Sequence, residues 1–175
     1  MLSKIRYYVK KETLRMIYFG IFSSILTYGS QIWGQHNAVT KKLQILQNKA
    51  LRIMHFQPPR TTATPLFKTS SILKLNDQIN LQNFLFTYDN LKNNLPISLR
   101  GKMEFLIHPH ETRNRDYLQL FRPRTNTIIY GSKSINARSI DIWNSINQDH
   151  HLVKLHEKSR AICKSFVYKL LLSSY

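Results

Sequence analysis

Carboxylates are scarce in this chain. Its 175 residues include 9 aspartates and glutamates against 26 lysines and arginines. The acidic residues stand alone, without an Asp-Asp, Asp-x-Asp or Glu-x-Asp pair. Reactions that run through two metal ions need carboxylates that converge on one site. We therefore expect the chain by itself to have no catalytic residues and no catalytic metal.

Cysteine and glycine are also rare. The one cysteine, Cys163, excludes an internal disulfide and a cysteine-rich zinc site, and we expect it to be a small buried side chain. Five glycines form no glycine-rich phosphate loop. The pairs His108/His110 and His150/His151 lack the i, i+4 spacing of zinc ligands on a helix, so they are interpreted as surface histidines. No cofactor and no metal is expected.

Long hydrophobic runs are missing as well. The first twelve residues have no uninterrupted apolar stretch, so they do not resemble a secretory signal. Residues 16–33 are uncharged and nearly long enough to span a membrane, but they include polar side chains and keep their apolar residues on one face. We expect a nuclear or cytoplasmic protein, with a membrane helix as a lesser alternative.

Positive charge is abundant. The formal net charge is +17, which produces strong self-repulsion unless a polyanion is present. A nucleic acid is the partner that this charge favours, and an anionic membrane surface or an incidental composition are the alternatives.

The segment from Thr13 to Trp33 predicts the central core helix. Its apolar residues follow the i, i+3, i+4, i+7 pattern, and the pattern extends to Ile32 and Trp33 if the helix continues through Gly29. The residues of this stripe are Leu14, Ile17, Tyr18, Ile21, Phe22, Ile25 and Leu26.

The sequence after Thr40, KKLQILQNKALRIMHF, predicts a second helix with two faces when residues are placed about 100° apart. The face expected to pack in the core contains Leu43, Leu46, Ala50, Ile53 and Met54. The adjoining face contains Lys41, Lys42, Lys49 and Arg52, with Ile45 as an apolar intruder. Such a helix can lie between a core and a phosphate backbone, although a solvated basic flank explains the pattern equally well.

Further helices are expected near Pro65, over residues 76–91, after Ser134, and over residues 155–172. Between residues 100 and 138 the helical period fades, and the short runs 117–121 and 127–130 could form a small β-hairpin. The predicted fold is mainly α, a small helical domain of about five to seven helices with an irregular basic segment. We divide it into a helical region, 1–99, and a basic segment with C-terminal helices, 100–175.

The irregular segment is rich in arginine with interleaved aromatic residues. Arginine forks and stackable rings suit single-stranded or hybrid nucleic acid, and a plain basic loop is the alternative. The candidate binding residues in this segment are Arg113, Arg115, Arg122 and Arg124.

Several short motifs resemble one family. The stretch IYFGIFSSILTYGSQIW, residues 17–33, resembles the IY-x-x-IF-x-S-x-L-x-Y-x-x-x-x-W stretch that follows the palm in reverse transcriptases of non-LTR retrotransposons, especially jockey-like elements. The similarity continues in the same order through LQNKALRIM (46–54), TPLFK (64–68), ILKL (72–75), HETR (110–113), Arg124-Thr125, Tyr130-Gly131 and IWN (142–144).

This resemblance implies that the chain corresponds to the thumb and C-terminal extension of an RNA-directed DNA polymerase. The thumb in such enzymes is a helical unit that lies against the template–primer duplex. The palm's paired aspartates are absent from this sequence, so the resemblance carries over contact with RNA or an RNA–DNA hybrid, but not catalysis. The parent's palm and fingers are a second implied partner. The rival hypotheses are a decayed structural remnant without activity and a membrane-associated helical protein.

Overall fold

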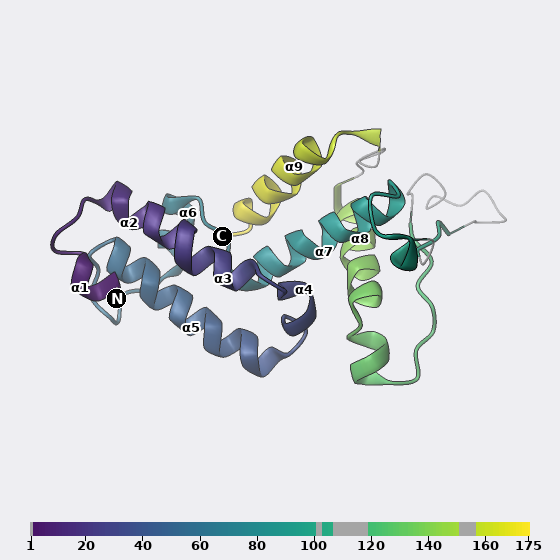
Figure 1. The fold of residues 1–175 in the computed structure, drawn as a ribbon, viewed down its shortest axis with the longest axis horizontal. Coiled ribbons are helices and arrows are strands. Elements are labelled where there is room, and N and C mark those ends of the chain that lie inside the picture. Colours follow the sequence, from purple (N-terminus) through teal and green to yellow (C-terminus); the bar gives the residue numbers. More distant parts are fainter. Residues whose placement is uncertain (1, 101–102, 107–118, 151–156) are drawn as a thin grey trace. The chain divides into compact units, whose positions relative to one another are not determined.

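The computed structural model describes residues 2–100, 103–106, 119–150 and 157–175 (Figure 1). The described residues are mainly helical, which confirms the predicted fold class. Six of their helices have at least seven residues, and no named strand occurs among them.

The chain separates into two compact units. Unit 1 consists of residues 1–79 and 168–175, and unit 2 consists of residues 80–167. The boundary that the sequence suggested near residue 100 lies inside unit 2. The two divisions between the units fall within helices α7 (Leu75–Leu91) and α9 (Arg160–Ser173).

Unit 1 is built from a succession of helices around one long one. The longest of them, α5, spans Asn37–Met54. Its N-cap is His36, four residues before the Thr40 cap that the sequence suggested, and Thr40 lies inside the helix. The others are α1 (Leu2–Ile5), α2 (Lys11–Ile17), η1 (Tyr18–Ser23), α3 (Ser24–Thr27), α4 (Ser30–Trp33) and α6 (Thr64–Ser70).

The segment predicted as one helix from Thr13 is interrupted twice. Residues 18–23 form a π-helical turn, which shifts the positions that follow relative to a regular 3.6-residue period. The chain then leaves the helix at Tyr28, which is extended, and Gly29, whose φ of 60° is left-handed. Leu14, Tyr18 and Leu26 are buried, as the predicted stripe requires. Two members of the predicted stripe, Ile21 and Ile25, are instead 48% and 69% exposed.

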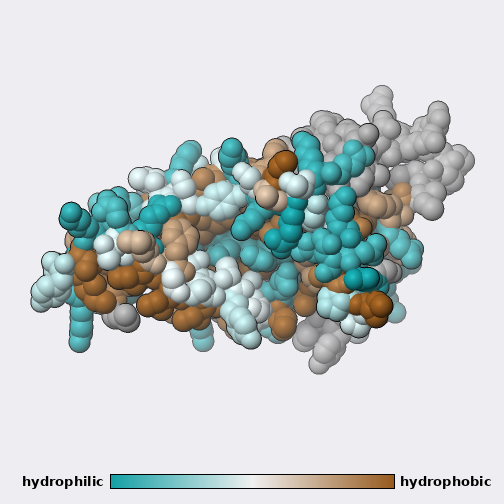
Figure 2. All heavy atoms as spheres, turned by 45° about the horizontal axis from the view of Figure 1, so that its top comes forward, coloured by the Kyte–Doolittle hydropathy of each residue, from teal (hydrophilic) through white to brown (hydrophobic). Residues whose placement is uncertain are grey.

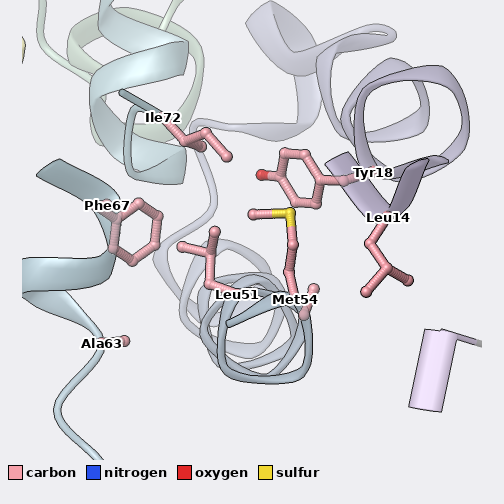
Figure 3. Packing of buried hydrophobic residues seen from close by; sticks show 8 residues of the cluster. Leu14, Tyr18, Leu51, Met54, Ala63, Phe67 and Ile72 are labelled. Atoms are coloured by element: carbon pink, nitrogen blue, oxygen red, sulfur yellow. The ribbon is translucent and has the colours of Figure 1, made fainter. Parts of the chain in front are cut away.

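The core of unit 1 forms where α2 and η1 meet α5 and α6. Figure 3 shows Leu14 and Tyr18 facing Leu51 and Met54 of α5, with Phe67 and Ile72 beside them. α5 is therefore rotated about its axis relative to the prediction, and Leu46, which was expected on the packed side, is 51% exposed. Burial of these apolar side chains provides the main stabilisation of the unit.

A buried glutamine explains why α5 is rotated about its axis relative to the prediction. Gln47 is fully buried, and its Nε2 donates to the Tyr18 hydroxyl and to the Leu73 carbonyl, both at 3.0 Å. Its Oε1 accepts from the side-chain Nε2 of Gln44. The side-chain Oε1 of Gln44 in turn accepts from the Leu75 amide at 2.9 Å. Because these polar groups are paired, a glutamine can occupy the centre of the packed face.

The last residues of the chain return to unit 1. The Tyr175 hydroxyl donates to an Asp77 carboxylate oxygen at 2.6 Å and accepts from the Lys74 amide at 2.7 Å. Burial and the neighbouring carboxylate raise the pKa of Tyr175 well above its usual range. These contacts link residues 168–175 to the start of α7.

Unit 2 packs the larger part of α7 against α8 (Ile135–His150). The Phe84 and Trp143 rings stack with centroids 5.0 Å apart. Arg160 at the start of α9 pairs with both carboxylate oxygens of Asp89 at 2.9 and 3.1 Å. Cys163 is fully buried, as the sequence predicted.

The predicted β-hairpin differs from the pairing in the described residues. Leu120 forms an isolated antiparallel bridge with Phe105, and residues 128–132 form a π-helical turn, η3. The Asn144 side chain also accepts a hydrogen bond from the Leu120 amide at 2.8 Å and donates one to the Leu120 carbonyl at 3.0 Å. In the described residues, Leu120 of the first run therefore pairs with Phe105 upstream of it and with the Asn144 side chain of α8 downstream of it, and not with the second run. Residues 117 and 118 lie outside the described part.

Candidate nucleic-acid interface

The outward side of α5 presents a row of cations in unit 1. Lys41, Lys42 and Lys49 are exposed, and Arg52 is half-buried. From Lys42 to Lys49 the helix rises about 10 Å at 1.5 Å per residue. Along the axis of a B-form duplex each strand carries one phosphate per about 3.4 Å, so the two lysines are separated by roughly the axial rise of three phosphates. The row is therefore long enough to contact more than one phosphate.

Unit 1 offers these cations little neutralising charge. From residue 13 to residue 76 the sequence contains no aspartate or glutamate. The carboxylates in unit 1 are Glu12 and Asp77, and Asp77 accepts the hydrogen bond from Tyr175. A surface with one sign of charge attracts polyanions and releases their counterions on binding.

Arg52 has a structural role as well. Its Nε donates to the Thr61 carbonyl at 2.6 Å and so holds the loop that follows α5. This loop begins with His55 and Phe56 and continues through Pro58 and Pro59. Arg52 is therefore fixed in position, whereas the three lysines are not held by any hydrogen bond of this kind that the structure shows.

Two hollows adjoin the cationic row. One, of about 580 Å³, is lined by Arg6, Ile45, Lys49, Arg52, Ile53, Phe56, Gln57, Pro58 and Pro59. The other, of about 320 Å³, is lined mainly by apolar side chains from α1, α2, η1 and α5, with Lys49 at its edge. No carboxylate lines either hollow in the described part of unit 1. Figure 2 shows apolar side chains lying beside polar ones on the face in view.

The arginine-rich segment is only partly described. Arg113 and Arg115 lie outside the described residues. Arg122 pairs with Asp141 at 2.5 Å, which lowers its net attraction for phosphate, and Arg124 is exposed. Both belong to unit 2, whereas the four cations of α5 belong to unit 1.

Sequence reasoning missed Arg6 and Phe56 as site residues. Arg6 comes from the N-terminal helix region, 43 positions before Lys49 in the sequence, so only tertiary structure places it at the same hollow. Phe56 follows the last turn of α5, and its exposure depends on a left-handed backbone that no residue pattern indicated. The signal that could have suggested Phe56 was the Pro58-Pro59 pair, which ends the helix just after it.

His55 provides a test of the loop geometry. Burial, followed by the nearby charges of Lys11 and Arg15, lowers the pKa of His55 below its usual value, and its Nε2 contacts the Ser70 hydroxyl. The unfolded chain therefore binds a proton more readily than the folded one. We expect the stability of unit 1 to fall as the pH drops below about 6.5, and to gain nothing from His55 above it.

The measurement is the thermal unfolding midpoint at pH 7.5 and at pH 5.5. Between these two pH values the unfolding midpoint of the wild-type chain should fall by more degrees than that of the His55→Gln variant, which has no imidazole to protonate. An equal loss in both proteins would contradict the assignment of His55.

Neither a metal site nor a membrane span is found in the described residues. They contain no group of three or more histidine, cysteine, aspartate or glutamate side chains arranged to hold a metal ion. None of the helices among them is both long enough and apolar enough to cross a bilayer. Comparisons with protein-family models, curated proteins and solved structures gave no match to this chain.

Proposed function

We propose that this chain binds the sugar–phosphate backbone of RNA or of an RNA–DNA hybrid, without sequence preference and without catalysis. The observation that carries the proposal is the solvent side of α5, where Lys41, Lys42 and Lys49 are exposed next to Arg52. No carboxylate occurs in the surrounding 64 residues of sequence, from 13 to 76. Contacts of this kind position a protein on a nucleic acid and do not read its bases.

The resemblance to non-LTR retrotransposon reverse transcriptases supports the same function. In that proposal the chain is a thumb-like part of an RNA-directed DNA polymerase, and the catalysis belongs to the palm of the parent protein. A mainly helical fold with a basic helix on its surface agrees with a thumb. Arg122 and Arg124 of unit 2 add backbone contacts, and the pair with Asp141 makes Arg122 the weaker of the two.

Exposed apolar residues fit a second partner, the palm and fingers of the same parent. Ile25, Tyr28 and Ile32 are each more than two-thirds exposed, and they lie around the break between α3 and α4. Exposed apolar side chains that gather in one region suit a protein–protein contact. The rival interpretation is a structural remnant that folds without binding anything.

The test of the proposal uses three RNA–DNA hybrids of equal length and unrelated sequence. Fluorescence anisotropy at low salt should give the three dissociation constants within a few-fold of one another, because backbone contacts carry no sequence information. A strong preference for one hybrid would contradict backbone binding. Failure to bind any of them would favour the structural remnant.

A further inference from the structure

Phe56 is held in an unusual conformation directly after α5. Its φ is 56°, in the left-handed region that bulky residues rarely adopt. The Phe56 amide donates to the Ile53 carbonyl at 3.2 Å, and the Gln57 amide donates to the Arg52 carbonyl at 2.9 Å. This is the hydrogen-bond pattern of a Schellman cap, in which glycine or asparagine usually occupies the position that Phe56 has here.

Burial does not offset the strain at Phe56. Phe56 is 51% exposed, so it gains little of the stabilisation that an aromatic side chain obtains in a core. Strained residues of this kind are concentrated at binding and catalytic sites. The cap keeps the ring at the surface, beside the last basic residue of the helix.

The ring lines the larger hollow together with three cations. Arg6, Lys49 and Arg52 lie around it, and Pro58 and Pro59 form a rigid part of the wall. The Nε of Arg6 is buried and has no hydrogen-bond partner among the described residues. A volume of about 580 Å³ is within the range of small-ligand sites, roughly 300–1,000 Å³.

The electrostatics of this hollow favour an anion. It lies near the C-terminal end of α5, where the helix dipole contributes about half a negative charge. Arg6, Lys49 and Arg52 outweigh that partial charge, and two of the terminal carbonyls are already engaged by the amides of Phe56 and Gln57. A ligand for this site therefore combines a negative group with a flat, stackable one.

From this combination we propose that the hollow holds one unpaired nucleotide, with its base stacked on the Phe56 ring and its phosphate against Lys49 and Arg52. Arg6 then contributes positive charge at the wall of the hollow. The inference rests on the proposed function, and it adds a preference for an unpaired base beside the backbone contacts along α5. Stacking of bases on aromatic rings tolerates any base, which is consistent with binding that ignores sequence.

The experiment compares two probes, a short fluorescent single-stranded RNA and a blunt-ended RNA–DNA hybrid of the same length. The variants are Phe56→Asn, which suits the left-handed position but removes the ring, and Phe56→Tyr, which keeps a stackable ring. Phe56→Asn should weaken binding of the single strand about fivefold to 100-fold, as removal of one stacked base does, and leave binding of the hybrid within twofold. Phe56→Tyr should resemble the wild type with both probes.

The outcomes separate this inference from the proposed function. If Phe56→Asn leaves single-strand binding unchanged while the wild type still binds the hybrid, the nucleotide site is wrong and the proposed function stands. An equal loss on both probes would also overturn the nucleotide site, because the ring would then only support the shape of the interface. If the wild type binds neither probe, both proposals fail.

Discussion

Replacing Lys41, Lys42 and Lys49 together with glutamine should weaken binding of an RNA–DNA hybrid by on the order of tenfold for each phosphate interaction that is removed, at roughly 0.1 M salt. The three side chains are exposed, and their charges are the part of the interaction that releases counterions. Lysine and glutamine have similar helix propensities, so the stability of α5 should not change much. Anisotropy titrations measure the affinity, and thermal unfolding measures the stability.

The matched control removes the same charge elsewhere. Lys92, Lys164 and Lys169 are exposed residues outside the α5 row, and their joint replacement with glutamine lowers the net charge by the same amount. This control should keep most of the affinity. Arg52 is left intact in both variants, because its bond to the Thr61 carbonyl holds the loop after α5. Equal losses in the two variants would mean that net charge alone, and not the α5 row, determines binding.

Leu51→Ala should destabilise the fold by about 2–5 kcal/mol, as truncation of a buried leucine usually does. Leu51 is fully buried in the cluster that α5 forms with Leu14, Tyr18 and Phe67 (Figure 3). The reduced burial of apolar surface and the cavity that remains both contribute to the cost. Chemical denaturation followed by circular dichroism gives the free energy of unfolding.

Leu46→Ala is the control on the same helix. The sequence pattern places Leu46 on the core side of α5, but the structure leaves it 51% exposed. Its truncation should therefore cost less than about 1 kcal/mol. If Leu46→Ala were the more costly of the two, α5 would be oriented as the sequence pattern suggested, and the outward position of its lysines would be in doubt.

The helices could be predicted because their apolar residues recur at helical spacing. Prediction failed where a polar residue occupied the core. Gln47 counts as polar in any pattern of apolar residues, yet its amide is paired with Tyr18 and Leu73 in the interior. The sequence-based orientation of α5 therefore missed the true packing face by a fraction of a turn.

The prediction of one long helix from Thr13 failed for a different reason. It assumes a regular 3.6-residue period, whereas η1 inserts a π turn at Tyr18–Ser23 and Gly29 adopts a left-handed conformation. Both are changes of the backbone. The order of apolar and polar residues along the sequence is the same with or without them, so that order does not predict them. The consequence is a set of exposed isoleucines, including Ile25, that the pattern assigned to the core.

The candidate site was predictable in its charge and not in its shape. Lys41, Lys42 and Lys49 could be grouped from the sequence because they share one side of a single helix. The hollow beside them depends on Arg6 and on the loop at Phe56, which only tertiary packing brings to α5. The ion pair between Arg122 and Asp141 could not be predicted either, because it joins residues 19 positions apart in the sequence.

The salt dependence of hybrid binding tests the central claim most directly. Backbone contacts release about 0.9 counterion each, so three or four contacts along α5 predict that log K falls with log salt concentration at a slope of about −2.7 to −3.6. The affinity for a hybrid should therefore fall steeply between low and physiological salt. A flat response, or no binding even at low salt, would contradict the account.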